Sequence, residues 1–241
     1  MGINARAKAL FVNRVGQLPD VSTRLDKFTH WLRFAKWCHQ RGSFRVPPPT
    51  GSYMERFAYF RRILEGCTLR DTQFTFLEFG VYKGESLRWW RDHALHPNTR
   101  FVGFDTFSGL PTNWEGKQAG HFSTNGTVPQ MDDTRFRFEV GLFQDTLPLF
   151  LRSFERRGRL LVHLDADLYS STLFVLMTLG HLLQPDDLLL FDEFSSVTHE
   201  FRAFLDFLPC FQLAYDVPYR TGNFNRVCVR LLSHDYAERI A

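Results

Sequence analysis

The stretch Leu160-Leu161-Val162-His163-Leu164-Asp165-Ala166-Asp167 decides the fold, because a short apolar run ends abruptly in two aspartates. A second run, Leu188–Phe191, ends in Asp192 and Glu193, and Ser170–Leu183 between the two runs has the length of a crossover helix. Short apolar runs of this kind are typical of buried parallel strands. The carboxyl ends of neighbouring strands in an open α/β sheet meet at the ligand crevice. We therefore expect four carboxylates to converge where a hard cation and a substrate could bind, which predicts an enzyme.

Strands and helices alternate from residue 74 onward, which predicts a largely parallel, doubly wound α/β sheet. The expected strands are 74–79, 101–104, 136–140, 160–164, 188–191, 211–215 and 227–232. The expected helices are 85–93, 147–155, 170–183 and 199–208. Because the chain ends on two strands, we expect a terminal hairpin in which one strand runs antiparallel to the rest.

Residues 1–70 are expected to form a helical extension ahead of a domain at 71–241. Helical spacing predicts a first helix over 22–41 that has apolar residues on one face, namely Leu25, Phe28, Leu32 and Ala35. The run Pro47–Gly51 interrupts the chain as a linker or ordered turn, and a second helix is expected over 53–65. We expect both helices to pack against the domain or to cover it as a lid.

The composition is that of a folded intracellular protein. Of the 241 residues, 44% are hydrophobic and 26 are phenylalanine, which is ample for a packed core. No apolar run approaches the roughly 20 residues that span a bilayer, and no secretory leader is visible, so we expect a cytoplasmic protein. The four cysteines form no CxxC pair and are expected to stay reduced.

The charge is unevenly distributed. Residues 1–70 contain 13 Lys+Arg and 4 Asp+Glu, a net charge of +9, although the whole chain carries only +3. The basic segment could be a solvated helical surface, or it could face an anionic partner such as a nucleotide-sugar, a phosphorylated carrier or a membrane surface. Its contacts would then be Arg61-Arg62 and the group Arg33, Lys36 and Arg41. Nucleic acid is not expected, because the segment has no recognisable nucleic-acid-binding motif.

The first expected strand runs into Glu78-Phe79-Gly80-Val81-Tyr82-Lys83-Gly84-Glu85-Ser86. Gly80 and Gly84 permit a tight strand-to-helix turn and the close approach of a ligand. The spacing is not the GxGxxG of a pyrophosphate site, and Glu78 would instead suit a cofactor with a cationic amine. A purely structural turn is the alternative. Tyr82 could contact the cofactor or the acceptor, as could Trp114 and His121.

Two further strand ends support a nucleoside-like ligand. Asp105 follows the second strand, where open α/β sheets place an acidic residue on ribose hydroxyls. Gly141 and Phe143 follow the third strand and could form the floor of an adenine site, although a helix cap at Asp145 or Thr146 explains this loop equally well. The long segment Thr106–Thr134 is expected to be a substrate lid or pocket wall.

Five motifs occur in a characteristic order, and together they resemble a known family. They are Glu78-Phe79-Gly80-Val81, Phe104–Pro111, Gly141–Pro148, His163–Thr172 and Phe191-Asp192-Glu193. The chain resembles the TylF-type (macrocin O-methyltransferase) family of class I S-adenosylmethionine-dependent methyltransferases over roughly residues 74–232. The run Asp165–Thr172 is the most specific part of this resemblance.

The resemblance implies a Rossmann-like, seven-stranded sheet, S-adenosyl-L-methionine as methyl donor and Mg²⁺ as a probable metal. It places the metal on Asp165, Asp192 and Glu193, where related sequences have a second aspartate in place of the glutamate. It makes Asp167 the candidate general base. The donor would bind near the residues of the glycine turn and the next strand ends, with these candidates: Glu78, Gly80, Tyr82, Gly84, Ser86, Asp105, Ser108, Gly141, Phe143 and Asp165.

The leading functional hypothesis is an O-methyltransferase that acts on a hydroxyl of a sugar, a nucleotide-sugar or a glycosylated metabolite. Asp165 would assist Asp167 in catalysis, and His199 is a reserve base that could equally cap or pack. His163, inside an apolar strand, is expected to be a hydrogen-bonded core residue rather than a ligand. The alternatives are metal-independent methylation of another nucleophile, a non-catalytic interaction module with the same fold, and a dehydrogenase, which the missing GxGxxG opposes. A homodimer through the N-terminal helices is compatible with the sequence.

Overall fold

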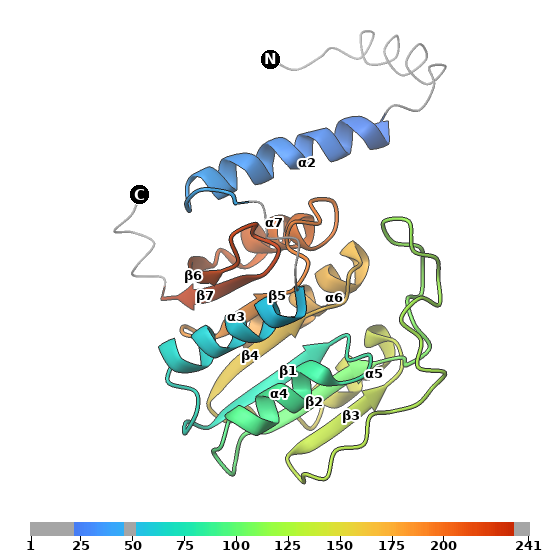
Figure 1. Ribbon diagram of the computed structural model, residues 1–241, viewed down its shortest axis with the longest axis vertical. Helices are drawn as coiled ribbons and strands as arrows, with labels where there is room; N and C mark the ends of the chain where they lie inside the picture. The colour runs from blue at the N-terminus through green and yellow to red at the C-terminus, as the bar shows by residue number, and fades with distance from the viewer. Residues whose placement is uncertain (1–21, 46–51, 234–241) are drawn as a thin grey trace.

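A computed structural model describes residues 22–45 and 52–233 of the chain (Figure 1). The predicted linker Pro47–Gly51 lies outside these residues. The helices are α2 (Ser22–His39), α3 (Ser52–Gly66), α4 (Glu85–His93), α5 (Phe143–Leu151), α6 (Tyr169–Leu179) and α7 (Glu200–Phe211), with a 3₁₀ turn η1 (Gly180–Leu182). The strands are β1 (Phe74–Phe79), β2 (Arg100–Asp105), β3 (Phe136–Val140), β4 (Arg159–Leu164), β5 (Leu188–Phe191), β6 (Ala214–Arg220) and β7 (Val227–Leu232). Within the described ranges, no helix combines the length and apolar character needed to cross a bilayer.

The strands form one seven-stranded sheet in the order β3-β2-β1-β4-β5-β7-β6. Strands β1 to β5 are mutually parallel, and β7 lies antiparallel between β5 and β6. This confirms the predicted Rossmann-like, mostly parallel sheet and its terminal hairpin. The chain order reverses between β1 and β4, which is the position where open α/β sheets bind their ligands.

Helices cover both faces of the sheet, and each face has its own apolar core (Figure 1). Strand β4 shows why: Leu160, Val162 and Leu164 point into the core beneath α5, α6 and α7, and Leu161 points into the core beneath α3 and α4. Side chains alternate between the two faces of a strand, so a strand buried on both sides reads as a continuous apolar run. The apolar run that predicted β4 therefore reflects two cores rather than one.

Helix α2 docks through a different face from the one expected. Leu25, Phe28 and Leu32 are 57–60% exposed, and Ala35 is also exposed. The helix packs instead through Phe34, whose ring lies 5.1 Å from that of Phe201, and through Trp37 against Phe194. Trp37 also donates a hydrogen bond to the Tyr215 hydroxyl at 3.0 Å, which anchors the buried face. The prediction chose the wrong one of two apolar stripes.

Several element boundaries differ from the predictions. Helix α5 begins at Phe143 rather than 147, because the Leu142 carbonyl already accepts the N–H of Thr146, and Pro148 is tolerated inside the helix. Helix α7 continues to Phe211, and Gln212 then ends it in a left-handed conformation, so β6 starts at Ala214 rather than 211. These shifts leave the strand ends that form the site unchanged.

Candidate active site

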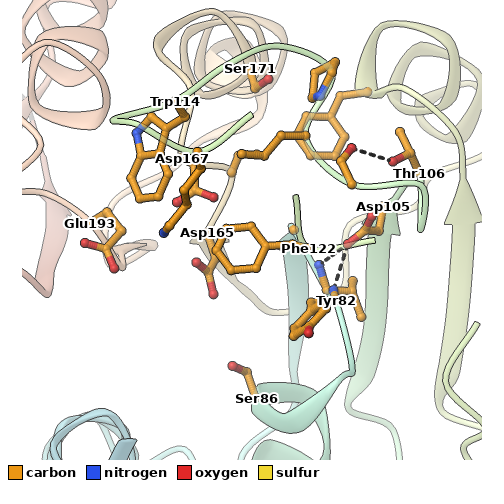
Figure 2. A pocket seen from close by; sticks show the side chains of 18 of the residues that line it. Tyr82, Ser86, Asp105, Thr106, Trp114, Phe122, Asp165, Asp167, Ser171 and Glu193 are labelled. Atoms are coloured by element: carbon orange, nitrogen blue, oxygen red, sulfur yellow. Dashed lines mark hydrogen bonds between the residues drawn. The ribbon is translucent and has the colours of Figure 1, made fainter. Parts of the chain in front are cut away.

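A cavity of about 610 Å³ lies at the carboxyl ends of β1, β2, β4 and β5, where the strand order reverses (Figure 2). This volume is in the range of small-molecule sites, about 300–1,000 Å³. Its walls come from helix α3, the turn after β1, the ends of three further strands and the segment 106–134. The residues that line this cavity include Arg56, Gly80, Tyr82, Ser86, Asp105, Trp114, Lys117, Phe122, Phe143, Asp165, Asp167, Glu193 and Arg226.

The carboxylate of Asp105 holds the turn after β1 in place. Its Oδ2 accepts the backbone N–H groups of Val81 at 2.7 Å and Tyr82 at 2.8 Å, as the dashed lines in Figure 2 show. Its Oδ1 accepts only the N–H of Phe107. A carboxylate oxygen has two lone pairs, so Oδ1 can still accept a ligand hydroxyl.

The backbone conformation and the close approach of β4 both require glycine at position 80, whether or not a ligand binds there. It has a φ of +94°, and a Cβ at this position would collide with the carbonyl oxygen of Asp165. The ends of β1 and β4 therefore approach more closely than any other residue would permit. Gly84 also has a positive φ, but it faces Pro129 and Met131 rather than the cavity.

Six of the predicted donor-binding residues line the cavity: Gly80, Tyr82, Ser86, Asp105, Phe143 and Asp165. Four do not, namely Glu78, Gly84, Ser108 and Gly141. Ser108 is exposed outside the cavity, and the N–H of Gly141 is bonded to the carbonyl of Asp105. A role of these four in donor binding stays a prediction.

Glu78 lies behind the cavity wall, in a buried pair with His163. The two side chains meet at 2.8 Å through Glu78 Oε1 and His163 Nδ1, and both are about 1% exposed. Burial alone would lower the pKa of His163, but the acidic groups around it outweigh burial and raise the pKa to about 9. Burial raises the pKa of Glu78. His163 is thus the hydrogen-bonded core histidine that the sequence predicted, and it pairs with one oxygen of the carboxylate that was expected to bind an amine.

The ends of β4 and β5 bring three carboxylates to the cavity, those of Asp165, Asp167 and Glu193 (Figure 2). Burial, followed by the nearby Asp165, raises the pKa of Asp167 to about 8. Burial and Asp192 raise the pKa of Glu193 to about 7, and the same two causes raise the pKa of Asp165. Like charges gathered in a partly desolvated site disfavour ionisation, and perturbed groups of this kind are typical of functional sites.

Asp167 also has an unusual backbone. Its φ is +60°, in the left-handed region that few residues other than glycine, asparagine and aspartate adopt. Such a conformation costs on the order of 1–3 kcal/mol and persists where the surrounding structure enforces it. Here it turns the chain sharply between β4 and α6 and presents the carboxylate to the cavity.

The fourth predicted carboxylate, Asp192, is buried and bound by two arginines. Arg226 donates from Nε to Oδ1 at 2.8 Å, and Arg56 forms a close ion pair with Oδ2 through Nη2. Burial would raise the pKa of Asp192, but His163, Arg56 and Arg226 outweigh burial and hold it below its usual range. Asp192 is therefore an anion with both oxygens in use.

The predicted metal ligands do not fit a metal in this arrangement. His163, Asp165 and Asp192 each offer a ligand atom, and these atoms lie within 4.8 Å of one another. His163 Nδ1 is bonded to Glu78 and its Nε2 has no hydrogen-bond partner in the described part of the chain, but the two oxygens of Asp192 are each bonded to a guanidinium group. A divalent cation needs unshared carboxylate oxygens. Asp165 is also paired with Arg56, whose Nη2 lies 3.2 Å from Asp165 Oδ2, so arginine holds two of the three predicted carboxylates.

Sequence reasoning missed the basic side chains of the site. Arg61 and Arg62, predicted contacts of an anionic partner, do not line the cavity: Arg61 is exposed, and Arg62 contacts the carbonyl of Arg220 and the ring of Tyr219. Arg41 stacks on Trp37, with the guanidinium carbon 4.2 Å from the ring centroid. Among the described residues, the arginines that line the cavity are Arg56 and Arg226. A signal for Arg56 exists, because it lies one helical turn before Phe60, on the buried face of α3.

His199 does not line the cavity. It lies at the start of α7, and its Nδ1 accepts the backbone N–H of Tyr169, the first residue of α6, at 3.3 Å. Burial lowers its pKa. The ring therefore caps a helix, and its predicted role as a reserve base has no geometric support.

The segment 106–134 forms one wall of the cavity, as predicted. Trp114 is buried, and Lys117 Nζ lies 4.1 Å from its ring centroid and 4.6 Å from that of Phe122. Two cation–π contacts of this kind hold the ammonium group between the rings. The segment thus brings both aromatic surface and one positive charge to the cavity.

Comparisons with known proteins agree with this fold. Residues 77–194 match the family model described as "Methyltransferase domain". The structure of the O-methyltransferase NovP is similar, with a TM-score of 0.59 and 20% identity over 77% of this chain and 84% of that chain. The calicheamicin methyltransferase CalS11 has a TM-score of 0.52 and 19% identity over 95% of this chain and 94% of that chain. No curated protein sequence matches the chain.

A third structure, titled "cmcI-D160 Mg-SAM", has a TM-score of 0.51 and 22% identity over 73% of this chain and 70% of that chain. At these identities the structural likeness establishes the fold. The match begins within β1 and ends just after Glu193, so it includes all the strand ends that surround the cavity. Residues 77–194 are similar to a methyltransferase domain, and the chain shares its seven-stranded, Rossmann-like fold with solved structures of S-adenosylmethionine-dependent methyltransferases.

Proposed function

We propose that the chain transfers a methyl group from S-adenosylmethionine to a hydroxyl of a sugar, a nucleotide-sugar or a glycosylated metabolite. One observation carries the proposal. The cavity joins an organised turn after β1, suited to a nucleoside, to a carboxylate of raised pKa, suited to removing a hydroxyl proton.

The donor would occupy the part of the cavity next to the turn after β1. Asp105 Oδ1 has a free lone pair for a ribose hydroxyl, and Phe143 offers an apolar surface beside it. Asp165 and the other carboxylates make this region favourable for a sulfonium cation. The donor supplies an activated methyl group, so the protein's task is to orient the acceptor and to remove its proton.

Asp167 is the general base of the proposed reaction. The acceptor oxygen forms a bond to the methyl carbon, the carbon–sulfur bond breaks with its electrons going to sulfur, and the hydroxyl proton passes to Asp167. A general base must be deprotonated at the working pH and must also have a high affinity for the proton that it removes. A pKa of about 8 meets both requirements, because a fraction of Asp167 is ionised near neutral pH and the carboxylate binds the proton well. Orientation of the reacting groups can contribute a further 7–11 kcal/mol or so.

The acceptor class is supported by the chemistry of the wall. Trp114 and Phe122 offer flat surfaces for the face of a sugar ring, and Asp167 and Glu193 offer acceptors for hydroxyl groups. Among the similar structures, one CalS11 structure is titled a TDP-rhamnose 3'-O-methyltransferase. Lys117, held between the two aromatic rings, would suit an anionic acceptor such as a nucleotide-sugar.

The test is to incubate the protein with labelled S-adenosylmethionine and a panel of sugars, nucleotide-sugars and phenols. We expect label in a hydroxyl-bearing sugar compound, with transfer lost in Asp167→Asn. A suitable control is Asp71→Asn. Asp71 is exposed and precedes β1, at the amino ends of the parallel strands, whereas the cavity lies at their carboxyl ends. A protein that neither binds the donor nor transfers label would instead fit the non-catalytic module.

A further inference from the structure

A single guanidinium group lies between the ends of β4 and β5. Arg56 Nη2 forms a close ion pair with Asp192 Oδ2 and lies 3.2 Å from Asp165 Oδ2. These are two of the three carboxylates that the sequence predicted as metal ligands. The guanidinium group of Arg56 thus bridges Asp165 and Asp192, the two carboxylates that a metal was expected to bridge.

Arg56 is held in this position rather than reaching it from the surface. Its side chain is 19% exposed, and its Nη1 lies 3.4 Å from Ser86 Oγ. Helix α3 is anchored one turn further on by Phe60, which is fully buried and packs edge-on against His163. The guanidinium is therefore part of the packed wall of the cavity.

A second arginine completes the neutralisation of Asp192. Arg226 is buried and uses Nε to bind Asp192 Oδ1 at 2.8 Å, so the two guanidinium groups occupy both carboxylate oxygens. A divalent cation beside Asp192 would have to compete with two guanidinium groups for the carboxylate oxygens and would be repelled by their two positive charges. For a metal to bind, Arg56 would have to leave.

We infer that Arg56 takes the place of the predicted divalent cation, as a positioning residue that holds Asp165 and Asp192 together and keeps a positive charge at the cavity wall. The inference deepens the proposed function, and it makes the methyl transfer independent of a metal. A guanidinium cannot bind a hydroxyl oxygen as a Lewis acid, but it can donate hydrogen bonds to an oxygen that gains negative charge. Removal of the acceptor proton then falls to Asp167 alone.

Manganese binding tests the inference without an acceptor. Mn²⁺ is titrated into the purified full chain, and bound metal is followed by electron paramagnetic resonance. The variants are Arg56→Met, Arg56→Lys, and the control Arg61→Met, which removes an exposed arginine from the same helix. We expect Arg56→Met to bind about one Mn²⁺ at least tenfold more tightly than wild type, because a repelling charge is gone. Arg56→Lys and Arg61→Met should resemble wild type, and Arg56→Met/Asp165→Asn should lose the gained site.

Two results would overturn the inference. Tight binding of one Mn²⁺ to the wild-type chain, abolished by Asp165→Asn, would mean that a metal displaces Arg56. Equal affinities of wild type and Arg56→Met would mean that Arg56 does not occupy the cation's place. The comparison of wild type with Asp165→Asn does not require the Arg56→Met protein to fold. This comparison alone can therefore contradict the inference.

A separate measurement distinguishes this inference from the proposed function. S-adenosylhomocysteine is titrated into the same wild-type sample by calorimetry. Failure to bind this product would contradict the proposed methyl transfer, whereas the manganese comparison reports only on the carboxylates around Arg56.

Discussion

Asp105 accepts the backbone N–H of Tyr82 at 2.8 Å, across 23 residues of sequence, and so ties the end of β2 to the turn after β1. The bond places Tyr82 in a left-handed conformation at the cavity. The proposed donor site depends on this tie.

The first prediction concerns Asp105→Ala. The substitution leaves two backbone N–H groups without their charged acceptor and removes a candidate partner for a ribose hydroxyl. Hydrogen bonds to charged groups contribute about 1.5–3 kcal/mol each, so S-adenosylhomocysteine affinity should fall at least about tenfold. Calorimetric titration checks this, with Asp71→Ala as the exposed control. An unchanged affinity would remove Asp105 from the donor site.

The second prediction concerns Asp167→Asn. The amide cannot take a proton, so turnover should fall by about 10²–10⁴ while S-adenosylhomocysteine still binds. Steady-state kinetics with the acceptor found in the panel, together with calorimetry, separate the two effects. Substantial residual turnover would assign the base to another group.

The pH profile of the wild-type chain is a third prediction. Asp167 acts as a base only when it is deprotonated, and its pKa is raised to about 8. We therefore expect kcat/KM to rise with pH between about 6 and 9, with its midpoint near this pKa. A profile that is flat over the same range would contradict the assignment.

The fourth prediction concerns the stability of Glu200→Gln. Glu200 is fully buried, its Oε2 accepts the backbone N–H of Glu193, and burial followed by the charge of Glu193 raises its pKa well above the usual range. The folded state thus favours the protonated acid, whose stabilising contribution is complete below the unfolded pKa and is lost as pH rises through the folded pKa. Glutamine mimics the protonated form at every pH.

The variant should therefore match wild type near pH 5 and melt at a higher temperature near pH 8. Each kcal/mol gained corresponds to about 2–4 °C for a chain of this size. Thermal unfolding followed by circular dichroism at both pH values provides the measurement. A difference that shrinks as pH rises would mean that Glu200 is ionised in the folded protein.

The fifth prediction tests how α2 docks. Trp37→Ala removes a buried ring that packs against Phe194 and bonds to Tyr215, and it should cost about 3–5 kcal/mol. Trp31 lies on the same helix but is 44% exposed, so Trp31→Ala should cost far less. Unfolding in urea compares the two variants. Equal losses would mean that α2 does not pack through the face described above.

The strand ends of the site were predictable because their signals are local. Runs such as Leu160–Leu164 are apolar at every position, since alternate side chains enter two cores, and the residues that follow are acidic. A parallel sheet then brings these ends together, and this does not depend on the conformation of the loops. The same local logic identified the pocket wall at 106–134.

The charge partners were not predictable, because they depend on contacts between distant residues. Asp192 reads in the sequence as a free carboxylate, yet its partners Arg56 and Arg226 are 136 and 34 residues away. Glu78 likewise reads as a ligand for an amine, and only the parallel pairing of β1 with β4 places His163 beside it. The docking face of α2 was not predictable for a related reason. The helix carries two apolar stripes, and only its contacts with distant parts of the chain determine which one is buried.

The central claim is that a methyl donor binds at the reversal of strand order, beside a carboxylate base. A crystal structure of the full chain with S-adenosylhomocysteine tests it most directly. We predict the nucleoside next to Asp105 and Tyr82 and the sulfur facing the side of the cavity that holds Asp167. Binding at another place on the molecule, or a sulfur turned away from Asp167, would contradict the account.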